Sequence, residues 1–285
     1  MLPFLTTIAA PALTFILMLI VGLELRPEDF RRVALYPRVV VIVTLGQILL
    51  LPPMALLVVR LLEPPPELAV AMVFLAFSPG GAISNYYTSL AGRNVALSVT
   101  LTAISTLFSL ISIPIAATIF LDFIGIGAAS ISMPKGTIAL QLFLFVVLPI
   151  ILGMVLGSML SECVRRWGPI LRIGSLVLVA ALLAVSLWTV RDAFTASLTD
   201  IALITTLFTC GAMLVGYLIA CAVPESDREV IVIETAVRNI PVALLLGNSV
   251  LPSTTYVGFL AGYFLMEVIL MVPYALFVRN QRALK

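Results

Sequence analysis

Long apolar runs constrain this chain more than any other feature of its sequence. A helix that crosses a bilayer needs about 20 predominantly apolar residues, and nine such segments follow one another with short connections. They lie at approximately 4–24, 35–61, 67–91, 94–121, 136–160, 168–190, 200–223, 227–251 and 254–278. Hydrocarbon offers no partner to a free backbone N–H or C=O, so each segment is predicted to be helical. We therefore expect an all-α polytopic membrane protein, with one transmembrane domain over residues 1–285.

The composition supports this class and disfavours several functions. Of the 285 residues, 62% are hydrophobic and 11% are charged, and a formal net charge of +2 gives no reason to expect a nucleic-acid partner. The chain contains no histidine, which excludes a histidine-based zinc site, general base or proton relay. An intramembrane enzyme would need a nucleophile with a base or a metal, and the sequence shows no such set. The expected partners are membrane lipid and a small solute.

Positively charged residues in the connections predict the orientation, because cytoplasmic loops are enriched in Lys and Arg. With the N-terminus outside, the outer connections hold three of them, Arg60, Lys135 and Arg191. The inner side then holds twelve, which are Arg26, Arg31, Arg32, Arg38, Arg93, Arg165, Arg166, Arg172, Arg228, Arg279, Arg282 and Lys285. We therefore predict an outside N-terminus and a cytoplasmic C-terminus, in a cell membrane that is the inner membrane in a bacterium.

Two of the apolar segments contain residues that interrupt a helix. The first carries Pro79, Gly80 and Gly81, and the second carries Pro241 in the run E-T-A-V-R-N-I-P. Proline removes a backbone donor, and glycine raises the entropy cost of a helix. A simple proline kink is the alternative, but a true break at membrane depth requires burial in protein or a water-filled cavity. Both breaks therefore mark a candidate binding site.

The order of the segments predicts how the two breaks are related. The second broken segment follows the first by five spans, so the two run in opposite directions across the membrane. Transporters with inverted repeats have this arrangement, and their interrupted helices meet at a midplane site for substrate and ions. We predict inverted repeats of four and five helices, with the two broken helices crossing at the midplane.

Oxygen-bearing side chains gather around the breaks. Ser84 and Asn85 follow the first break, Ser98 and Thr102 share one face of the next segment, and Glu234 precedes the second break. A carboxylate inside a span costs at least about 2.5 kcal/mol and usually has a partner. Such oxygens suit a hard cation such as sodium. Alternatively, the hydroxyls bond to their own helix and Glu234 pairs with an arginine one turn later.

Other polar residues extend this candidate site. Gln47 could supply another oxygen or bond across helices, and Glu267 is an intramembrane acid with no nearby cation in the sequence. Helix N-termini that meet at the crossover favour an anion. The expected substrate-binding residues are Ala82, Ile83, Ser84, Asn239 and Glu267.

Three motifs resemble those of the bile acid:sodium symporter family, and the likeness covers essentially the whole chain. They are S-P-G-G-A-I-S-N, N-V-A-L-S-V-T-L-T and E-x-x-x-R-N. The resemblance implies a nine-span form that lacks the opening helix of the first repeat, with a core of about 34–121 and 200–279 and a panel of about 1–25 and 136–190. It also implies two sodium sites. The first consists of Ser84, Asn85, Ser98, Thr102 and Glu234, and the second includes Gln47 and Glu234.

One position departs from the family pattern. Arg238 stands where the second sodium site usually has a glutamine, and a fixed guanidinium there would repel sodium. The resemblance implies an alternating-access symporter of an organic anion, such as a bile acid or a small carboxylate, and we expect sodium coupling through one site. The alternative is a sodium-independent transporter in which Arg238 replaces an ion. The substrate and the oligomeric state stay open at this point.

Overall fold

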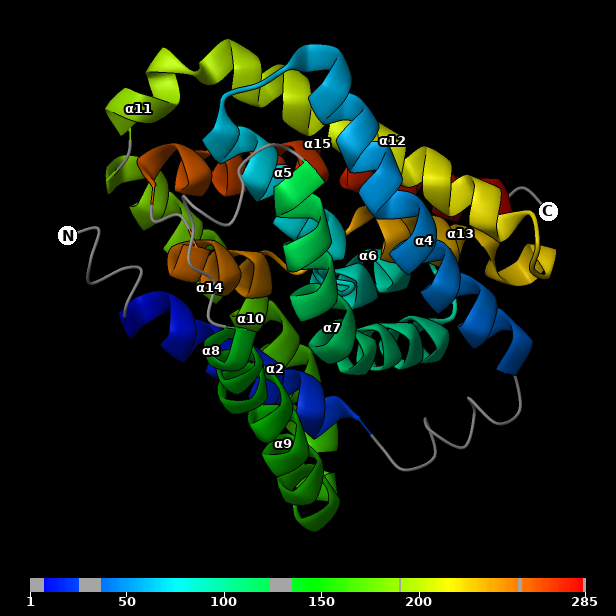
Figure 1. The fold of residues 1–285 in the computed structure, drawn as a ribbon. Helices are drawn as coiled ribbons and strands as arrows, with labels where there is room; N and C mark the ends of the chain where they lie inside the picture. The colour runs from blue at the N-terminus through cyan, green and yellow to red at the C-terminus, as the bar shows by residue number, and fades with distance from the viewer. Residues whose placement is uncertain (1–7, 26–36, 124–134, 190, 251–252, 284–285) are drawn as a thin grey trace.

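The computed structural model describes residues 8–25, 37–123, 135–189, 191–250 and 253–283 (Figure 1). Its elements in chain order are α2 (Ala10–Glu24), α4 (Pro37–Leu62), α5 (Pro66–Phe77), α6 (Ile83–Leu90), α7 (Val95–Phe123), α8 (Lys135–Leu142), the π-helical turn η2 (Phe143–Val147), α9 (Leu148–Met159), α10 (Ser161–Thr189), α11 (Arg191–Ala196), α12 (Leu198–Ala220), the 3-10 turn η3 (Glu225–Asp227), α13 (Arg228–Ala236), α14 (Ile240–Val250) and α15 (Thr254–Ala283). No strand occurs within these ranges. Four cations that the orientation prediction counted, Arg26, Arg31, Arg32 and Lys285, lie outside the described residues.

The helices have the length and composition of membrane-spanning elements. In the described part of the chain, four stretches are long and apolar enough to cross a bilayer, and they are Pro37–Leu62, Leu140–Met159, Leu198–Ala220 and Thr254–Gln281. Three shorter apolar helices accompany them, within α2, α5 and α7. The prediction of an all-helical, multi-pass membrane protein is confirmed, whereas the count of nine spans stays a prediction.

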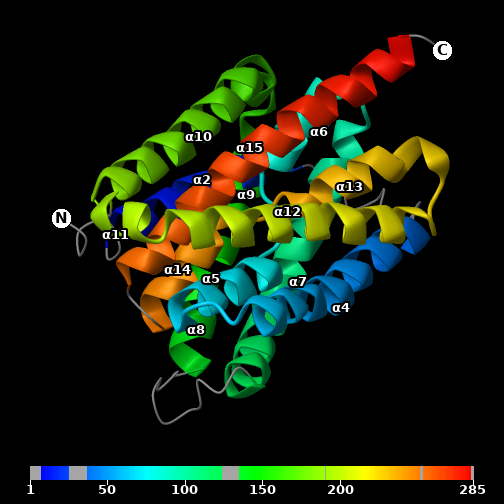
Figure 2. The ribbon, with the colours of Figure 1, turned by 90° about the horizontal axis from the view of Figure 1, so that it is seen from above.

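The helices pack in two neighbouring groups. In one, α2 packs against α9 and α10. In the other, α12 packs against α4, α13 and α15, while α5 packs against α4, α7 and α15. Figure 1 shows α2, α8 and α9 together, away from α4 and α12, and Figure 2 shows α15 beside α12. The groups touch where α2 meets α14 and where α10 meets α15.

The close contact between α2 and α9 depends on a glycine at position 153, which has no side chain. A Cβ atom on Gly153 of α9 would overlap the carbonyl oxygen of Leu19 and would lie 2.8 Å from the Cα of Gly22. Apolar side chains gain little from leaving lipid, so membrane helices associate through close van der Waals packing at small residues. The two backbones therefore approach as closely as they do because position 153 is a glycine.

Both predicted interruptions are present in the structure. Helix α5 ends at Phe77 and α6 begins at Ile83, while α13 ends at Ala236 and α14 begins at Ile240. Pro241 lies in the first turn of α14, where a missing N–H leaves no intrahelical bond unmade. The second break thus falls just before the proline.

We expect Gly153→Ala to lower stability, because overpacking that forces a backbone shift costs about 1–3 kcal/mol. Gly174→Ala in α10 is the control, since a Cβ there meets no atom within 4 Å and alanine favours a helix interior by about 1 kcal/mol. Thermal unfolding of the purified variants measures both effects. Equal stability of the two variants would show that the α2–α9 contact does not need a glycine.

Candidate functional site

The two breaks pair with each other through their backbones. The N–H of Gly81 donates to the carbonyl of Val237 at 3.0 Å, and the N–H of Asn239 donates to the carbonyl of Pro79 at 2.9 Å. These bonds form one antiparallel bridge between Gly80 and Arg238. Each unwound segment therefore satisfies polar groups of the other, which is what buried non-helical backbone requires.

A carboxylate and three hydroxyl groups meet directly beside this crossover. Glu234 is completely buried, and its Oε2 accepts hydrogen bonds from Ser84 Oγ at 2.6 Å and Ser98 Oγ at 2.9 Å. Its Oε1 accepts a hydrogen bond from Thr102 Oγ1 at 2.6 Å. The hydroxyl oxygen of Ser84 lies 3.4 Å from those of both Ser98 and Thr102. Residues far apart in the chain, from α6, α7 and α13, thus form one compact oxygen cluster.

Asn85 extends this oxygen cluster along α6. Its side chain is buried, and its Oδ1 atom has no hydrogen-bond partner among the described residues. A buried acceptor without a donor is costly, and a bound cation would remove that cost. The hydroxyls can also turn their protons away from an ion and offer lone pairs. The residues present therefore fit a sodium ion, and all five predicted ligands lie on the adjoining elements of the crossover.

Gly80 leaves room for the carboxylate of Glu234, because it has no side chain. A Cβ atom on this residue would overlap Glu234 Oε1. The N–H of Gly80 donates to Ser105 Oγ at 3.2 Å, and Ser105 in turn donates to the carbonyl of Thr102 at 3.0 Å. Sequence reasoning missed Ser105, although the spacing of 98, 102 and 105 places all three residues on one face of α7. The row of hydroxyls thus holds both the carboxylate and the first break.

Arg238 is bound to the end of α5 rather than to Glu234. Its Nη2 donates to the carbonyls of Ala76, at 3.5 Å, and Ser78, and its Nη1 donates to Gln47 Oε1 at 3.3 Å. These carbonyls lie at the C-terminal end of a helix, where a positive charge is stabilised. No ion pair joins Arg238 and Glu234 in the described structure. The alternative of a structural Glu234–Arg238 pair is therefore wrong for this conformation.

Gln47 uses both ends of its amide. Its Oε1 receives the guanidinium of Arg238, and its Nε2 donates to Thr235 Oγ1 at 3.3 Å. Sequence reasoning missed Thr235 and also Tyr263, whose hydroxyl accepts the N–H of Arg238 at 2.9 Å. Nothing in the local sequence marks either residue, because their partners come from other helices.

A small cavity separates the crossover from α2. Its lining includes the predicted substrate residues Ala82, Ile83 and Asn239, together with Leu17 and Met18 of α2. Its volume of about 20 Å³ has room for a water molecule. The Oδ1 atom of Asn239 accepts the N–H of Val242 at 3.1 Å and so caps α14. An organic anion would need this cavity to widen.

Glu267 lies apart from that small cavity. It is completely buried in α15, and neither carboxylate oxygen has a hydrogen-bond partner in the described structure. The phenol groups of Tyr87 on α6 and Tyr263 on α15 face it and are the groups from which it could accept a hydrogen bond. Its role in substrate binding stays a prediction, and its environment differs from that of Glu234, which has three hydroxyl donors.

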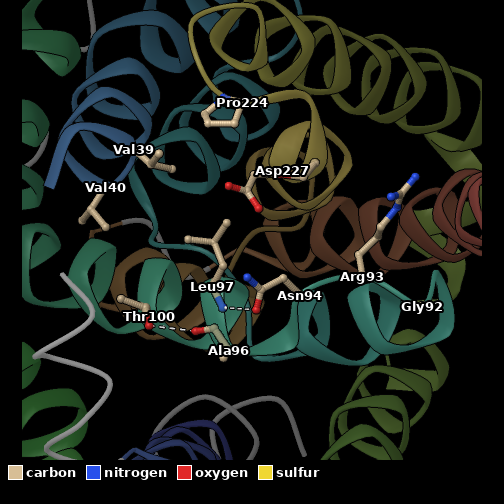
Figure 3. Close-up of a pocket in the computed structure, with 11 residues that line it drawn as sticks. Val39, Val40, Gly92, Arg93, Asn94, Ala96, Leu97, Thr100, Pro224 and Asp227 are labelled. Atoms are coloured by element: carbon tan, nitrogen blue, oxygen red, sulfur yellow. Dashed lines mark hydrogen bonds between the residues drawn. The ribbon is translucent and has the colours of Figure 1, made fainter. Parts of the chain in front are cut away.

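A wider cavity of about 920 Å³ opens at the start of α4, α7 and α13 (Figure 3). Figure 3 shows Asp227 pointing into it, towards Asn94 and Leu97. Burial, and secondly the charge of Glu229, raise the pKa of Asp227. The side chain of Arg93 pairs with Glu229 at 2.8 Å. None of the predicted site residues lines this cavity, so its size does not make it the ligand site.

We expect Thr102→Val to destabilise the protein more than Thr106→Val, one turn later on α7. Both threonines are buried, but Thr102 donates to the carboxylate of Glu234, whereas Thr106 donates to a backbone carbonyl at 2.7 Å. A hydrogen bond to a charged group contributes about 1.5–3 kcal/mol, against about 0.5–1.5 kcal/mol for a neutral one. The measurement is the shift in thermal unfolding of each variant. A larger shift for Thr106→Val would contradict the assigned bonding of Glu234.

Comparison with known sequences places this geometry in context. The sequence profile described as "Sodium Bile acid symporter family" matches residues 10–217, which is more than half of the chain. An uncharacterized sodium-dependent transporter of Bacillus subtilis (strain 168), YocS, is 30% identical over 151 residues, which cover 53% of this chain and 45% of the relative.

Two eukaryotic relatives match longer stretches. The mouse "P3 protein" is 28% identical over 237 residues, which cover 78% of this chain and 47% of the relative. The Arabidopsis thaliana "Probable sodium/metabolite cotransporter BASS1, chloroplastic" is 28% identical over 236 residues, which cover 82% and 57%. The chain therefore spans about half the length of the curated relatives that it matches.

Proposed function

Because the chain belongs to the sodium bile acid symporter family, we propose that it is a membrane transporter that moves an organic anion together with sodium. The observation that carries the proposal is the cluster of Glu234 with three hydroxyls, next to Asn85, whose Oδ1 has no partner among the residues that the structure describes. The names of relatives, a sodium-dependent transporter and a sodium/metabolite cotransporter, support sodium as the coupling ion. The family and these names also indicate a transporter rather than an enzyme.

We propose that the sodium ion binds to Glu234, Ser84, Asn85, Ser98 and Thr102. The ion would satisfy Asn85 Oδ1 and share the carboxylate with the hydroxyl groups. The buried oxygen set is suited to a hard cation. Within the described residues, no group of three or more His, Cys, Asp and Glu side chains could hold a metal, so nothing favours a transition metal instead.

The proposed substrate is an anion such as a bile acid or a small carboxylate. The N-terminal ends of α6 and α14 border the small cavity, together with Arg238, and positive helix ends and a guanidinium all attract negative charge. Leu17 and Met18 of α2 close its other side. We propose that movement of α2 and its neighbours away from the crossover opens this cavity to one side of the membrane at a time.

The proposed architecture is a panel of about 1–25 and 136–190 moving against a core of about 34–121 and 200–279. Packing of α2 with α9 and α10, and of α12 with α4, α13 and α15, supports this division. The opposed broken helices support nine spans in inverted repeats of four and five. We propose that the protein lies in a cell membrane with its N-terminus outside.

We propose that Arg238 replaces a second sodium ion. Its guanidinium binds Gln47 and the terminal carbonyls of α5, which are the oxygens that could otherwise hold a cation. Arginine stays protonated and cannot leave its site during the cycle. Because Arg238 does not pair with Glu234, the carboxylate stays available to the first sodium site. We therefore propose coupling through one sodium ion. Sodium-independent transport is the second candidate, with Arg238 as the fixed charge.

Replacing Glu234 with Gln should remove the stabilisation of the protein by sodium. At about 100 times its dissociation constant, a ligand of the folded state alone adds about 2.7 kcal/mol. Thermal unfolding in sodium chloride and in potassium chloride measures this difference. Glu229→Gln is the matched control on α13, because its side chain pairs with Arg93 outside the site. A sodium response that persists in Glu234→Gln would refute the ligand assignment.

Arg238→Gln should create a second sodium-binding event, since it removes the fixed charge and keeps an amide beside Gln47. Transport or substrate binding should then depend more steeply on sodium concentration, with a Hill coefficient that rises from about 1 towards about 2. Arg93→Gln, which removes a cation away from the crossover, should leave the slope unchanged. An unchanged slope in a folded Arg238→Gln variant would mean that the arginine does not replace an ion.

A further inference from the structure

Glu267 is a buried acid that belongs neither to the proposed sodium ligands nor to the lining of the small cavity at the crossover. Its side chain is 0% exposed, and both oxygens lack a hydrogen-bond partner within the described part of the chain. Glu234 is equally buried but accepts three hydroxyl hydrogen bonds. An ionised carboxylate without donors or a paired cation is very costly in a low-dielectric interior, and such a group takes up a proton instead.

Among the side chains that the structure describes, no cation faces Glu267. Tyr87 from α6 and Tyr263 from α15 are the titratable groups that face it. From the neighbouring elements, Glu234 faces the hydroxyls of α6 and α7, and Arg238 faces the end of α5. Charged residues on α10, α11 and α12 whose side chains are described are exposed, and they are Glu162, Arg166, Arg191, Asp192 and Asp200.

Tyr263 connects this acid to the crossover. Its hydroxyl donates to the carbonyl of Ala236 at 2.7 Å and accepts the N–H of Arg238 at 2.9 Å. In this conformation the hydroxyl proton of Tyr263 is therefore given to the end of α13 rather than to Glu267. On the other side, Tyr87 lies three residues after Ser84, on the same short helix. The two phenols that face Glu267 thus connect it with both broken helices.

A count of buried charges gives this acid a role in the transport cycle. The buried charged side chains in the described structure are Glu234, Arg238 and Glu267. With both acids ionised and one sodium bound, their sum is zero, whereas protonation of Glu267 makes it +1. Only the second state offers a net positive charge to a monovalent anion. Anion binding and protonation of Glu267 should therefore favour each other.

We propose that Glu267 is a proton-binding site, neutral in this conformation, whose proton is taken up and released in step with the anion. When the site hydrates, the carboxylic acid gives its proton to water and leaves a carboxylate, and the reverse transfer reloads it. The coupling rests on the proposed anion transport, but the protonation itself does not. The site would make the protein a carrier that responds to a pH gradient as well as to sodium.

The infrared spectrum of the purified, ligand-free protein at about pH 7 tests the protonation. The carbonyl stretch of a protonated carboxylic acid should be present in the wild type and absent from Glu267→Gln. Glu234→Gln, in the matched acid of the neighbouring site, should retain the band of Glu267. If Glu267→Gln does not fold, Tyr87→Phe should shift the band, since it removes the phenol that faces Glu267 from another helix. The proposal is wrong if the wild-type spectrum lacks a carboxylic-acid band. It is also wrong if the band is unchanged in both Glu267→Gln and Tyr87→Phe.

Uptake into proteoliposomes tests the coupling, with taurocholate and pyruvate as probe anions at constant sodium. If only the protonated form accepts the anion, the apparent dissociation constant should rise about tenfold per pH unit once Glu267 loses its proton. Glu267→Gln should transport without this pH dependence, whereas Asp227→Asn, at the cavity of Figure 3, should retain it. A pH dependence identical in the wild type and Glu267→Gln would overturn the coupling. Failure of both probes in the wild type would count against the proposed substrate class alone, because the infrared band still decides the protonation.

Discussion

Mutual hydrogen bonding of two unwound segments is the interaction on which the rest of this structure depends. Hydrocarbon gives no partner to a backbone that leaves the helix, yet both α5–α6 and α13–α14 do so at the same place. The hydrogen bonds from Gly81 to Val237 and from Asn239 to Pro79 satisfy backbone groups of both unwound segments. Each break therefore supplies hydrogen-bond partners for the backbone of the other.

The crossover also sets the electrostatics of the site. Ending α5 at Phe77 leaves carbonyls that receive Arg238, and starting α6 at Ile83 places Ser84 against Glu234. Positive charge therefore gathers at one helix end while the carboxylate lies among hydroxyls. The buried acid at position 267 belongs to the same arrangement, because Tyr263 links its surroundings to the second break. The three buried ionisable side chains of the described structure, Glu234, Arg238 and Glu267, are thus arranged around the same two breaks.

Local chemistry predicted the breaks well, but proline alone did not determine them. Pro52 and Pro53 lie inside α4 and Pro273 lies inside α15, and these helices continue through them. The first break combines proline with two glycines, which adds entropy cost to the missing donor. The second falls before Pro241 rather than at it, since proline is well tolerated in the first helical turn. Position within a helix therefore decides what a proline does.

The sequence by itself determined the helical membrane class and the two interruptions, because apolar length and helix breakers are local properties. Its i, i+4 spacing also placed Ser98 and Thr102 on one face, but their meeting with Glu234 joins residues 136 and 132 positions apart. Only the tertiary structure decided the partners. Arg238 is near Glu234 in sequence, yet it binds the end of α5 and Gln47, since the crossover brings those oxygens closer. In the described structure Glu267 has no hydrogen-bond partner, because the hydroxyl of Tyr263, one turn away on α15, donates instead to the carbonyl of Ala236 at the second break.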